Sequence, residues 1–395
     1  MSQSAPDPKL TPWPVYADDE IAAVTAVLRA GKGNYWSGGE GRAFERAYAA
    51  HCGVAHGLAV ANGTVAIELA LYGLGIGAGD EVIVPARTFI ATAAAAVMRG
   101  AHPVVADIDP TSQNLTAATV AAAVSPRTRA VIVVHLVGWP VDMAPIMELS
   151  RKHNFVVIED CAQAHGARDH DRPVGGIGHG GCFSFCQDKI ISTGGEGGMV
   201  VTNDTAAYER MWTFRDHGKD FKRANAGDVG AGFQFLVDSF GTNWRLTEMQ
   251  SAIGRRQLEK LPRWVTRRRE IAAQLSQTLD SIDGVKTPTP PAHAHHSFYK
   301  FTFQIDPAAL KAGWDRDRII ADLAARGVPA RVGGCPDIAR EAAFGVPGFT
   351  SAVAHPSADW LAPRTIMLPV HPTLTDGNVA FLAETTRDVL RTTLR

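Results

Sequence analysis

The feature that most constrains this chain is an alternation of short apolar runs with helical patterns over its first two-thirds. Seven runs are expected to be strands: His56–Ala61, Glu81–Pro85, Pro103–Ile108, Ala130–Leu136, Phe155–Glu159, Cys182–Phe185 and Gly198–Thr202. The helices expected between them are Thr64–Leu74, Ile90–Arg99, Ala117–Val124 and Met143–Lys152. Several strands are almost continuously apolar, as in parallel sheets covered by helices on both faces. The pattern predicts an α/β fold with a doubly wound, mainly parallel, seven-stranded sheet.

The remaining segments predict an arm before the sheet and a smaller domain after it. The first residues, MSQSAPDPKLTPWP, suggest a loose arm. Further helices are expected at Asp19–Ala30, Glu40–His51, Ala206–Arg215, Arg316–Arg326 and Asp376–Leu394. Thr247 and Gln250 fit a capping box, and Pro262 is expected to kink or divide the helix that they open. We expect an arm and large domain over residues 1–265 and a small α+β domain over residues 266–395.

Charge, hydropathy and cysteine usage exclude several classes of protein. The formal net charge is −1, which gives no electrostatic reason to expect nucleic acid or an anionic membrane as a partner. The most apolar stretches are too short to span a bilayer, and the first residues do not resemble a signal peptide. Five cysteines without paired spacing favour reduced thiols over disulfides or a zinc site. We expect a cytoplasmic enzyme without a metal.

Candidate catalytic groups follow two of the expected strands. Asp160 ends one strand, and Ser184 and Lys189 follow another, ahead of the glycine-rich stretch GGEGG. Ligands of doubly wound sheets bind at the carboxyl ends of the strands. A desolvated lysine offers a neutral amine for Schiff-base chemistry, and a carboxylate can hold the protonated nitrogen of a pyridine ring. Taken singly, a loop lysine is usually a solvated charge and a strand-end carboxylate usually a turn or helix cap.

Two other stretches could bind phosphate. Gly63 and Thr64 begin a helix directly after a strand, where free N–H groups and the helix dipole favour an anion; the alternative is a plain turn capped by Asn62. The stretch GGIGHGG weakly resembles a dinucleotide-binding loop. It does not follow a strand and open a helix as that fingerprint requires, so we expect a turn.

Taken together and in order, these segments resemble the DegT/DnrJ/EryC1/StrS family of sugar aminotransferases, from NYWSGGEGRAFE near the start to LPVHPTLTD near the end. EDCAQAHGA matches one family motif, with Cys161 at an alanine position, and FSFCQDKIISTGGEGG matches the segment of the Schiff-base lysine. The resemblance implies fold-type I architecture and a pyridoxal 5'-phosphate cofactor. It implies that Lys189 carries the cofactor as a Schiff base and that Asp160 contacts the pyridine nitrogen. Gln163 is implied beside the ring or its phenolic oxygen, and Ser184 at the phosphate.

The same resemblance extends to VPARTFIAT and GTNWRLTEMQSAIG. It implies that Phe89 stacks on the cofactor ring, although a core phenylalanine is the other interpretation. It also implies that Asn243 reaches the phosphate in a neighbouring subunit, so that a homodimer shares its active sites. Arg87 either faces the substrate or is a surface charge. His165 and His217 are expected to be structural.

The reaction that the resemblance implies is transamination from L-glutamate to a keto-sugar nucleotide, ketonic at C3 or C4, in amino-sugar, lipopolysaccharide or antibiotic-sugar biosynthesis. Lysine at position 189 argues against the dehydratases of the family, which carry histidine there. Amination of a non-nucleotide cyclic ketone, of the aminocyclitol or aminobenzoate type, stays open. A nicotinamide-dependent dehydrogenase and a non-catalytic sugar-nucleotide sensor are the alternatives from other classes.

Overall fold

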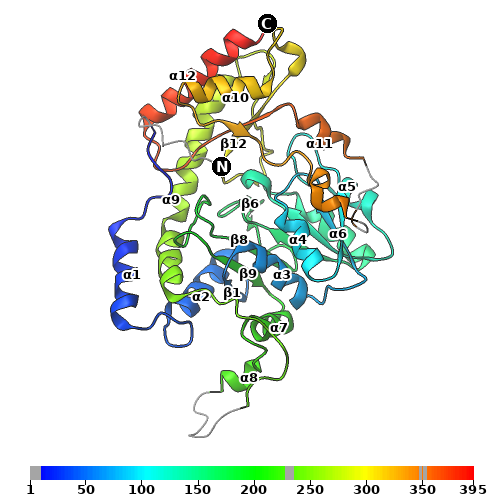
Figure 1. Cartoon of the computed structure of the whole chain (residues 1–395), viewed down its shortest axis with the longest axis vertical. Helices are drawn as coiled ribbons and strands as arrows, with labels where there is room; N and C mark the ends of the chain where they lie inside the picture. Colours follow the sequence, from blue (N-terminus) through cyan, green and yellow to red (C-terminus); the bar gives the residue numbers. More distant parts are fainter. Residues whose placement is uncertain (1–9, 227–234, 347–348, 350–353) are drawn as a thin grey trace.

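A computed structural model of the 395-residue chain describes residues 10–226, 235–346, 349 and 354–395 (Figure 1). Its main sheet has seven strands in the order β1-β9-β8-β5-β4-β2-β3. These strands are β1 His56–Val60, β2 Glu81–Pro85, β3 His102–Ala106, β4 Thr128–Val134, β5 Val156–Asp160, β8 Gly180–Ser184 and β9 Gly198–Thr202. Neighbours from β8 to β3 run parallel, whereas β9 is antiparallel to both β8 and β1. The predicted α/β architecture is confirmed.

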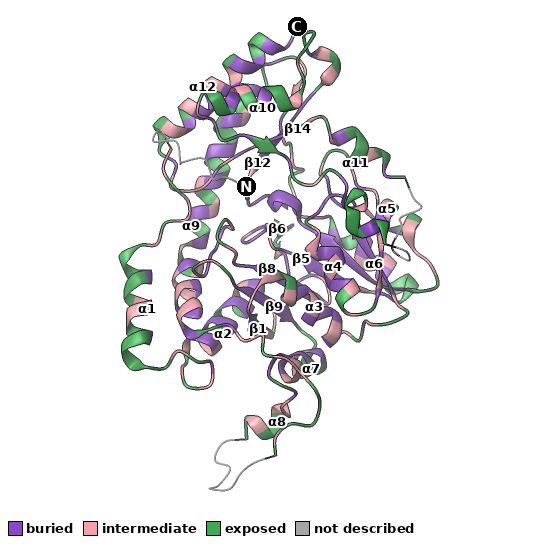
Figure 2. Cartoon of the chain, viewed as in Figure 1, coloured by how far each residue is buried: buried purple, intermediate pink, exposed green. Residues whose placement is uncertain are grey.

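Side chains of the sheet alternate between two apolar clusters on its opposite faces. Cys182 and Val200 belong to the cluster that includes helices α3, α4 and α7, whereas Phe183 and Met199 belong to the one that includes α2. The helices that flank the sheet are α2 Glu40–Cys52, α3 Gly63–Gly73, α4 Ala91–Met98, α5 Ala117–Ala123, α6 Met143–His153 and α7 Thr205–Arg215. Both faces are therefore covered, and burial concentrates around the sheet (Figure 2).

A second, antiparallel sheet of four strands lies toward the C-terminal end, in the order β10-β12-β14-β13. Its strands are β10 Val285–Lys286, β12 Phe301–Ile305, β13 Arg331–Val332 and β14 Thr365–Leu368. The helices near it are α10 Arg316–Ala325 and α12 Asp376–Thr393, and together with the end of α9 (Glu248–Leu279) they form a separate apolar cluster. Ile338 and Leu361, the latter in α11 (Pro356–Leu361), belong instead to the cluster of the large sheet. The domain division at residue 265 stays a prediction.

Helix α9 is not divided at Pro262, although division was one of the two expected outcomes, and a kink there stays a prediction. It runs unbroken over 32 residues, so the proline does not divide it. Leu261 and Trp264 are buried on either side of Pro262, and α1 (Asp18–Ala30), α2 and α12 pack along the helix. This packing outweighs the loss of one backbone hydrogen bond at the proline. The predicted capping box of Thr247 and Gln250 is confirmed.

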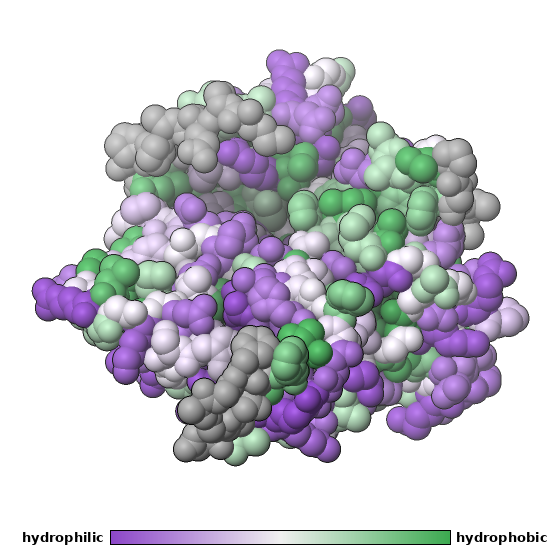
Figure 3. Space-filling model, turned by 60° about the horizontal axis from the view of Figure 1, so that its bottom comes forward, coloured by the Kyte–Doolittle hydropathy of each residue, from purple (hydrophilic) through white to green (hydrophobic). Residues whose placement is uncertain are grey.

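The outer surface mixes hydrophilic and hydrophobic residues, and the face shown in Figure 3 is hollowed in its upper half. Among the described helices, none combines the length and the apolar character that a membrane span requires. A short extension with α8 (Phe221–Ala224) projects from the large sheet beyond α7 (Figure 1).

Candidate active site

A cavity of about 680 Å³ opens where β5 and β8 end and α3 begins. Seven of the eight residues expected to hold the cofactor line it: Gly63, Thr64, Phe89, Asp160, Gln163, Ser184 and Lys189. Asn243 does not. Other residues, which no motif in the sequence indicated, also line this cavity: Thr88, Thr92, Cys186, Asp188, Glu196 and Tyr299. The topology explains the convergence, because the carboxyl ends of parallel strands meet at one edge of a sheet.

Asp160 is the last residue of β5 and is 6 % exposed. Its Oδ1 accepts a hydrogen bond from the Ala162 N–H at 3.1 Å, and its Oδ2 accepts one from the Thr92 hydroxyl at 2.9 Å. Burial raises the pKa of Asp160, although these hydrogen bonds and the charge of Lys189 act to lower it. A buried carboxylate without a full counter-charge is suited to bind a cationic ligand group.

The start of α3 and the end of β8 approach each other closely. A Cβ added at Gly63 would lie 2.6 Å from the Cβ of Ser184, so only glycine fits there. The Asn62 side chain accepts a hydrogen bond from the Val65 N–H at 3.0 Å and caps the helix, as the alternative interpretation predicted. The first N–H groups of the helix, next to Ser184, remain available to an anion in the cavity.

Gln163 is oriented by an unusual residue in the loop after β4. Its Oε1 accepts a hydrogen bond from the Val137 N–H at 2.8 Å. Val137 has a φ of 52°, which is a costly conformation for a β-branched residue. Hydrogen bonds from Tyr299 N–H to Val137 O and from Ser297 N–H to Gly138 O hold this loop. With its oxygen occupied, the Gln163 amide presents its NH₂ group as the free donor.

Lys189 enters the cavity from the loop after β8. Its Nζ lies 4.9 Å from the centroid of the Tyr299 ring, a cation–π distance. The Tyr299 hydroxyl donates a hydrogen bond to Asp188, and burial together with this carboxylate raises the pKa of Tyr299 well above its ordinary value. Lys300 lies on the same ring, with its Nζ 4.8 Å from the centroid, and burial lowers its pKa to about 8. Both ammonium groups therefore lie within cation–π distance of the same ring.

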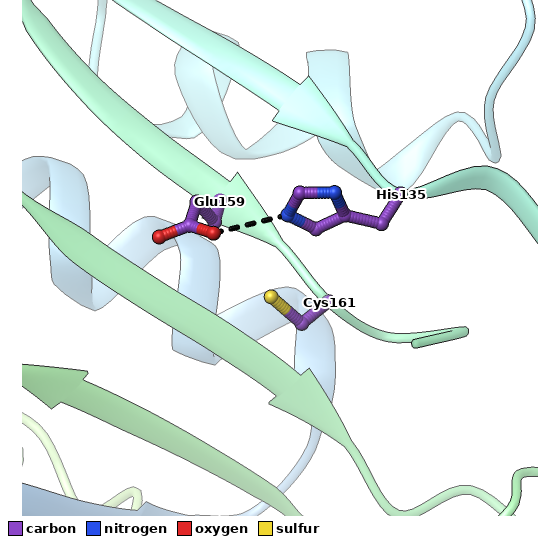
Figure 4. A group of neighbouring side chains, drawn as sticks. All are labelled: His135, Glu159 and Cys161. Carbon is purple, nitrogen blue, oxygen red and sulfur yellow. Dashed lines mark hydrogen bonds and ion pairs between the residues drawn. The ribbon is translucent and has the colours of Figure 1, made fainter. Parts of the chain in front are cut away.

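Behind Asp160, the preceding residue Glu159 organises a turn, and Figure 4 shows its contact with His135. Its carboxylate accepts backbone hydrogen bonds from Gly175, Ile177 and Gly178 at 2.6–2.8 Å and one from His135 Nε2 at 3.1 Å. His135 Nδ1 accepts from the Val141 N–H, which places the imidazole proton on Nε2. Although burial alone would raise it, the hydrogen bond from His135 and those from the turn hold the pKa of Glu159 below its ordinary value.

This network explains the stretch GGIGHGG, which forms a turn that leads into β8, as expected. The Sγ of Cys161, within 4.8 Å of the ligand atoms of His135 and Glu159, is the third member of the group in Figure 4. Burial raises the pKa of the Cys161 thiol well above its ordinary value, so the thiol is neutral. The nitrogen and oxygen atoms of the group already have hydrogen-bond partners, so we interpret it as a structural unit that fixes β5 and the turn.

Three further residues named from the sequence, Phe89, Asn243 and Arg87, differ in how far they are exposed and in what they contact. Phe89 is 68 % exposed at the cavity, so it is not a core residue. Asn243 is exposed on the loop before α9, where its backbone pairs with Asp216. Arg87 is not a surface charge: it is 1 % exposed and donates to Gly333 O and Thr365 Oγ1.

His165 lies in the core between β8 and α2. Its Nε2 is 2.9 Å from Ser184 O, and its Nδ1 is 2.7 Å from the Tyr48 hydroxyl. Burial lowers the pKa of His165 to about 3, so it is a neutral structural group that supports Ser184.

Comparisons with known proteins find relatives that are named as aminotransferases. The chain is 39 % identical over 360 residues to UDP-N-acetyl-3-dehydro-alpha-D-glucosamine 3-aminotransferase of Acidithiobacillus ferrooxidans, covering 89 % of each chain. It is 40 % identical over 289 residues to GDP-perosamine synthase of Caulobacter vibrioides, covering 73 % of this chain and 74 % of that protein. The solved structure of an aminotransferase from Psychrobacter cryohalolentis superimposes with a TM-score of 0.94 at 40 % identity, covering 97 % of this chain and 99 % of that one.

A sequence profile matches almost the whole chain, over residues 14–387. Together with the α/β fold and the lysine and aspartate at one cavity, this match identifies the chain as a member of the DegT/DnrJ/EryC1/StrS aminotransferase family.

Proposed function

We propose that this aminotransferase uses pyridoxal 5'-phosphate to transfer an amino group from L-glutamate to a keto-sugar nucleotide. The observation that carries the proposal is the meeting of Lys189, Asp160, Ser184 and the start of α3 at one cavity. These groups come from three segments of the chain, at the start of α3, the end of β5 and the end of β8 with the loop that follows it, and together they provide the parts of a cofactor site. A set of unrelated solvated residues would not be expected to converge in this way.

The groups in the cavity fit the cofactor chemically. The close approach of Gly63 to Ser184 leaves backbone N–H groups and a hydroxyl side by side, which suits a phosphate. Asp160 is buried and has an elevated pKa, so a pyridinium N–H would supply the positive partner that it lacks. When bound, the cofactor provides a cationic ring that accepts electron density from the substrate carbon next to the amino group.

The residues then have distinct tasks. The Lys189 amine is proposed to hold the cofactor and, once released, to move a proton to and from the α-carbon of the substrate. Asp160 keeps the positive charge on the ring nitrogen. The free NH₂ group of Gln163 and the exposed Phe89 ring are proposed to orient the cofactor. We further propose a homodimer in which Asn243 completes the phosphate site of the neighbouring subunit.

The substrate class is proposed from two relatives. Both are named for amino sugars carried on nucleotides, one on UDP and one on GDP. These names support a keto-sugar nucleotide as the acceptor. Amination of a cyclic ketone without a nucleotide is the competing activity.

The test is a single-turnover assay. The holoenzyme is incubated with L-glutamate, freed of it, and mixed with a panel of 3- and 4-keto sugar nucleotides. A control panel contains cyclic ketones without a nucleotide. We expect mass spectrometry to detect an amino-sugar nucleotide in the first panel only. Amination confined to the control panel would refute the proposed acceptor, and tight binding of sugar nucleotides without turnover would favour a sensor.

A further inference from the structure

The segment that precedes α1 ties the C-terminal part of the chain to the loop of Lys189. The Thr11 hydroxyl donates to Thr373 O at 2.6 Å, and the Thr373 hydroxyl donates to Pro12 O at 2.8 Å. Two reciprocal hydrogen bonds therefore fix this segment ahead of α12. The described part of the arm, from Leu10 onward, is thus packed rather than loose as the sequence suggested.

Trp13 lies at the centre of this connection. Its Nε1–H donates to the backbone oxygen of Lys189 at 3.1 Å. The indole packs edge-on against Trp264 at 5.2 Å and is stacked with His371 at 6.1 Å between ring centroids. The Arg268 guanidinium lies 5.2 Å from the indole centroid on α9. Three groups from two distant segments thus hold the indole while its only polar atom binds the lysine backbone.

The loop after Lys189 is held from two sides. The Tyr16 hydroxyl lies 3.1 Å from the Ser192 hydroxyl, so the arm makes a second contact three residues along the loop. From the other side, Gln257 of α9 accepts a hydrogen bond from the Ser192 N–H at 2.8 Å. Ile190 and Ile191 between these anchors are fully buried. We therefore expect the overall path of the loop to survive loss of one contact from the arm, so that such a loss acts on the local position of Lys189.

From these contacts we infer that Trp13 is a positioning residue for Lys189. The inference rests on the proposed role of Lys189. A lysine side chain has four rotatable bonds, so the place of its amine is set first by the backbone that carries it. The indole hydrogen bond fixes the peptide plane at Lys189 and thereby the direction in which the side chain leaves toward Tyr299. Misplacement by about 1 Å of a group in an active site can cost up to about a hundredfold in rate.

The test compares Trp13→Phe, which keeps a ring and removes the N–H donor, with the wild type. Trp360→Phe is the matched control, since Trp360 is 44 % exposed on α11, away from the cavity. We expect Trp13→Phe to lower kcat of the glutamate half-reaction by about tenfold while KM changes by less than about threefold. In the cofactor-free protein we expect faster hydrogen exchange in the peptide 186–193. Trp360→Phe should match the wild type in both measurements.

Replacing Trp13 by benzothienylalanine keeps the shape of the indole without its N–H group, and it decides the outcome if phenylalanine destabilises the fold. Exchange and kcat equal to the wild type in that protein would overturn the inference. Borohydride reduction followed by peptide mass spectrometry separates this result from failure of the proposed function. If the wild-type holoenzyme carries no cofactor on Lys189, the proposed function fails. If Lys189 is modified and the Trp13 replacements behave as wild type, only the positioning role is wrong.

Discussion

The Thr92 hydroxyl donates a hydrogen bond to Oδ2 of Asp160 at 2.9 Å and lies 2.8 Å from the Thr88 hydroxyl. Even with this bond, burial keeps the pKa of Asp160 above its ordinary value. The cofactor-free protein therefore contains a carboxylate whose ionisation is unfavourable in the fold. Asp160 therefore lowers the stability of the cofactor-free fold, as residues that serve ligand binding commonly do.

The first prediction concerns the stability of Asp160→Asn. Because burial raises the pKa of Asp160, the folded state holds the carboxyl proton more tightly than the unfolded state does. The free energy of unfolding therefore falls as pH rises from the ordinary pKa of aspartate through the raised pKa of the folded state. Asparagine is neutral at every pH. We expect cofactor-free Asp160→Asn to melt at a higher temperature than the wild type at pH 7.5, and the difference to shrink toward pH 4. Thermal unfolding followed by circular dichroism at both values tests this; equal melting temperatures throughout would contradict it.

The second prediction concerns the contact between α3 and β8. In Gly63→Ala the new methyl group would lie 2.6 Å from Ser184 Cβ and 3.1 Å from its Oγ, so one element must shift. Such overpacking costs about 1–3 kcal/mol, and here it also displaces the proposed phosphate ligands. We expect the affinity for pyridoxal 5'-phosphate to fall by at least about tenfold, measured by fluorescence titration of cofactor-free protein. Gly345→Ala is the control, because a Cβ there meets nothing within 4 Å.

The third prediction follows from His165. Burial lowers the pKa of His165 to about 3, below the ordinary value of 6.5, so between these pH values only the unfolded state binds the additional proton. The stability that the neutral His165 imidazole contributes is therefore lost progressively as pH falls from 6.5 toward 3. We expect His165→Gln to reduce the loss of melting temperature between pH 6.5 and 4, whereas the exposed His153→Gln should leave the slope unchanged. A slope unchanged in His165→Gln would show that this histidine is protonated in the fold.

The fourth prediction tests the proposed sharing of sites. Lys189→Ala and Asn243→Ala should each be inactive when pure, since each removes a group from both sites of a homodimer. After subunit exchange of an equal mixture, half of the dimers are mixed and each has one intact site. We expect about a quarter of the wild-type activity to return. A mixture that stays inactive would place both residues in the same subunit's site, provided that the subunits exchange. Differential tagging of the two variants shows whether mixed dimers have formed.

Much of the fold was predictable because continuous apolar runs are the direct signature of buried strands. The expected β2 and β9 match the structure residue for residue, and α5 differs by one residue at its end. By contrast, the sheet β11-β6-β7 consists of two-residue strands: Ala294–His295, Arg168–Asp169 and Arg172–Pro173. Segments of that length carry no periodicity, so the sequence could not indicate them.

The site was predictable where a motif and the topology agreed, as for Asp160, Lys189 and Gly63. Tyr299 was missed because it reaches the cavity from a loop more than a hundred residues after Lys189, and only the packing of that loop places its ring there. Thr92 was missed because a threonine inside a helix matches no motif, and only the packing of α4 brings its hydroxyl to Asp160. The Val137 backbone, which has a positive φ, orients the Gln163 amide. Valine rarely adopts a positive φ, so the residue type could not indicate this conformation.

The measurement that tests the central claim most directly is the visible absorption spectrum of the purified protein, with and without L-glutamate. We predict that the wild type shows the yellow band of lysine-bound pyridoxal 5'-phosphate and that L-glutamate bleaches it. Lys189→Ala, in which the amine is absent, should show no such band. A wild type that stays colourless after incubation with the cofactor, or a Lys189→Ala variant with the same band and the same response to L-glutamate, would contradict the account.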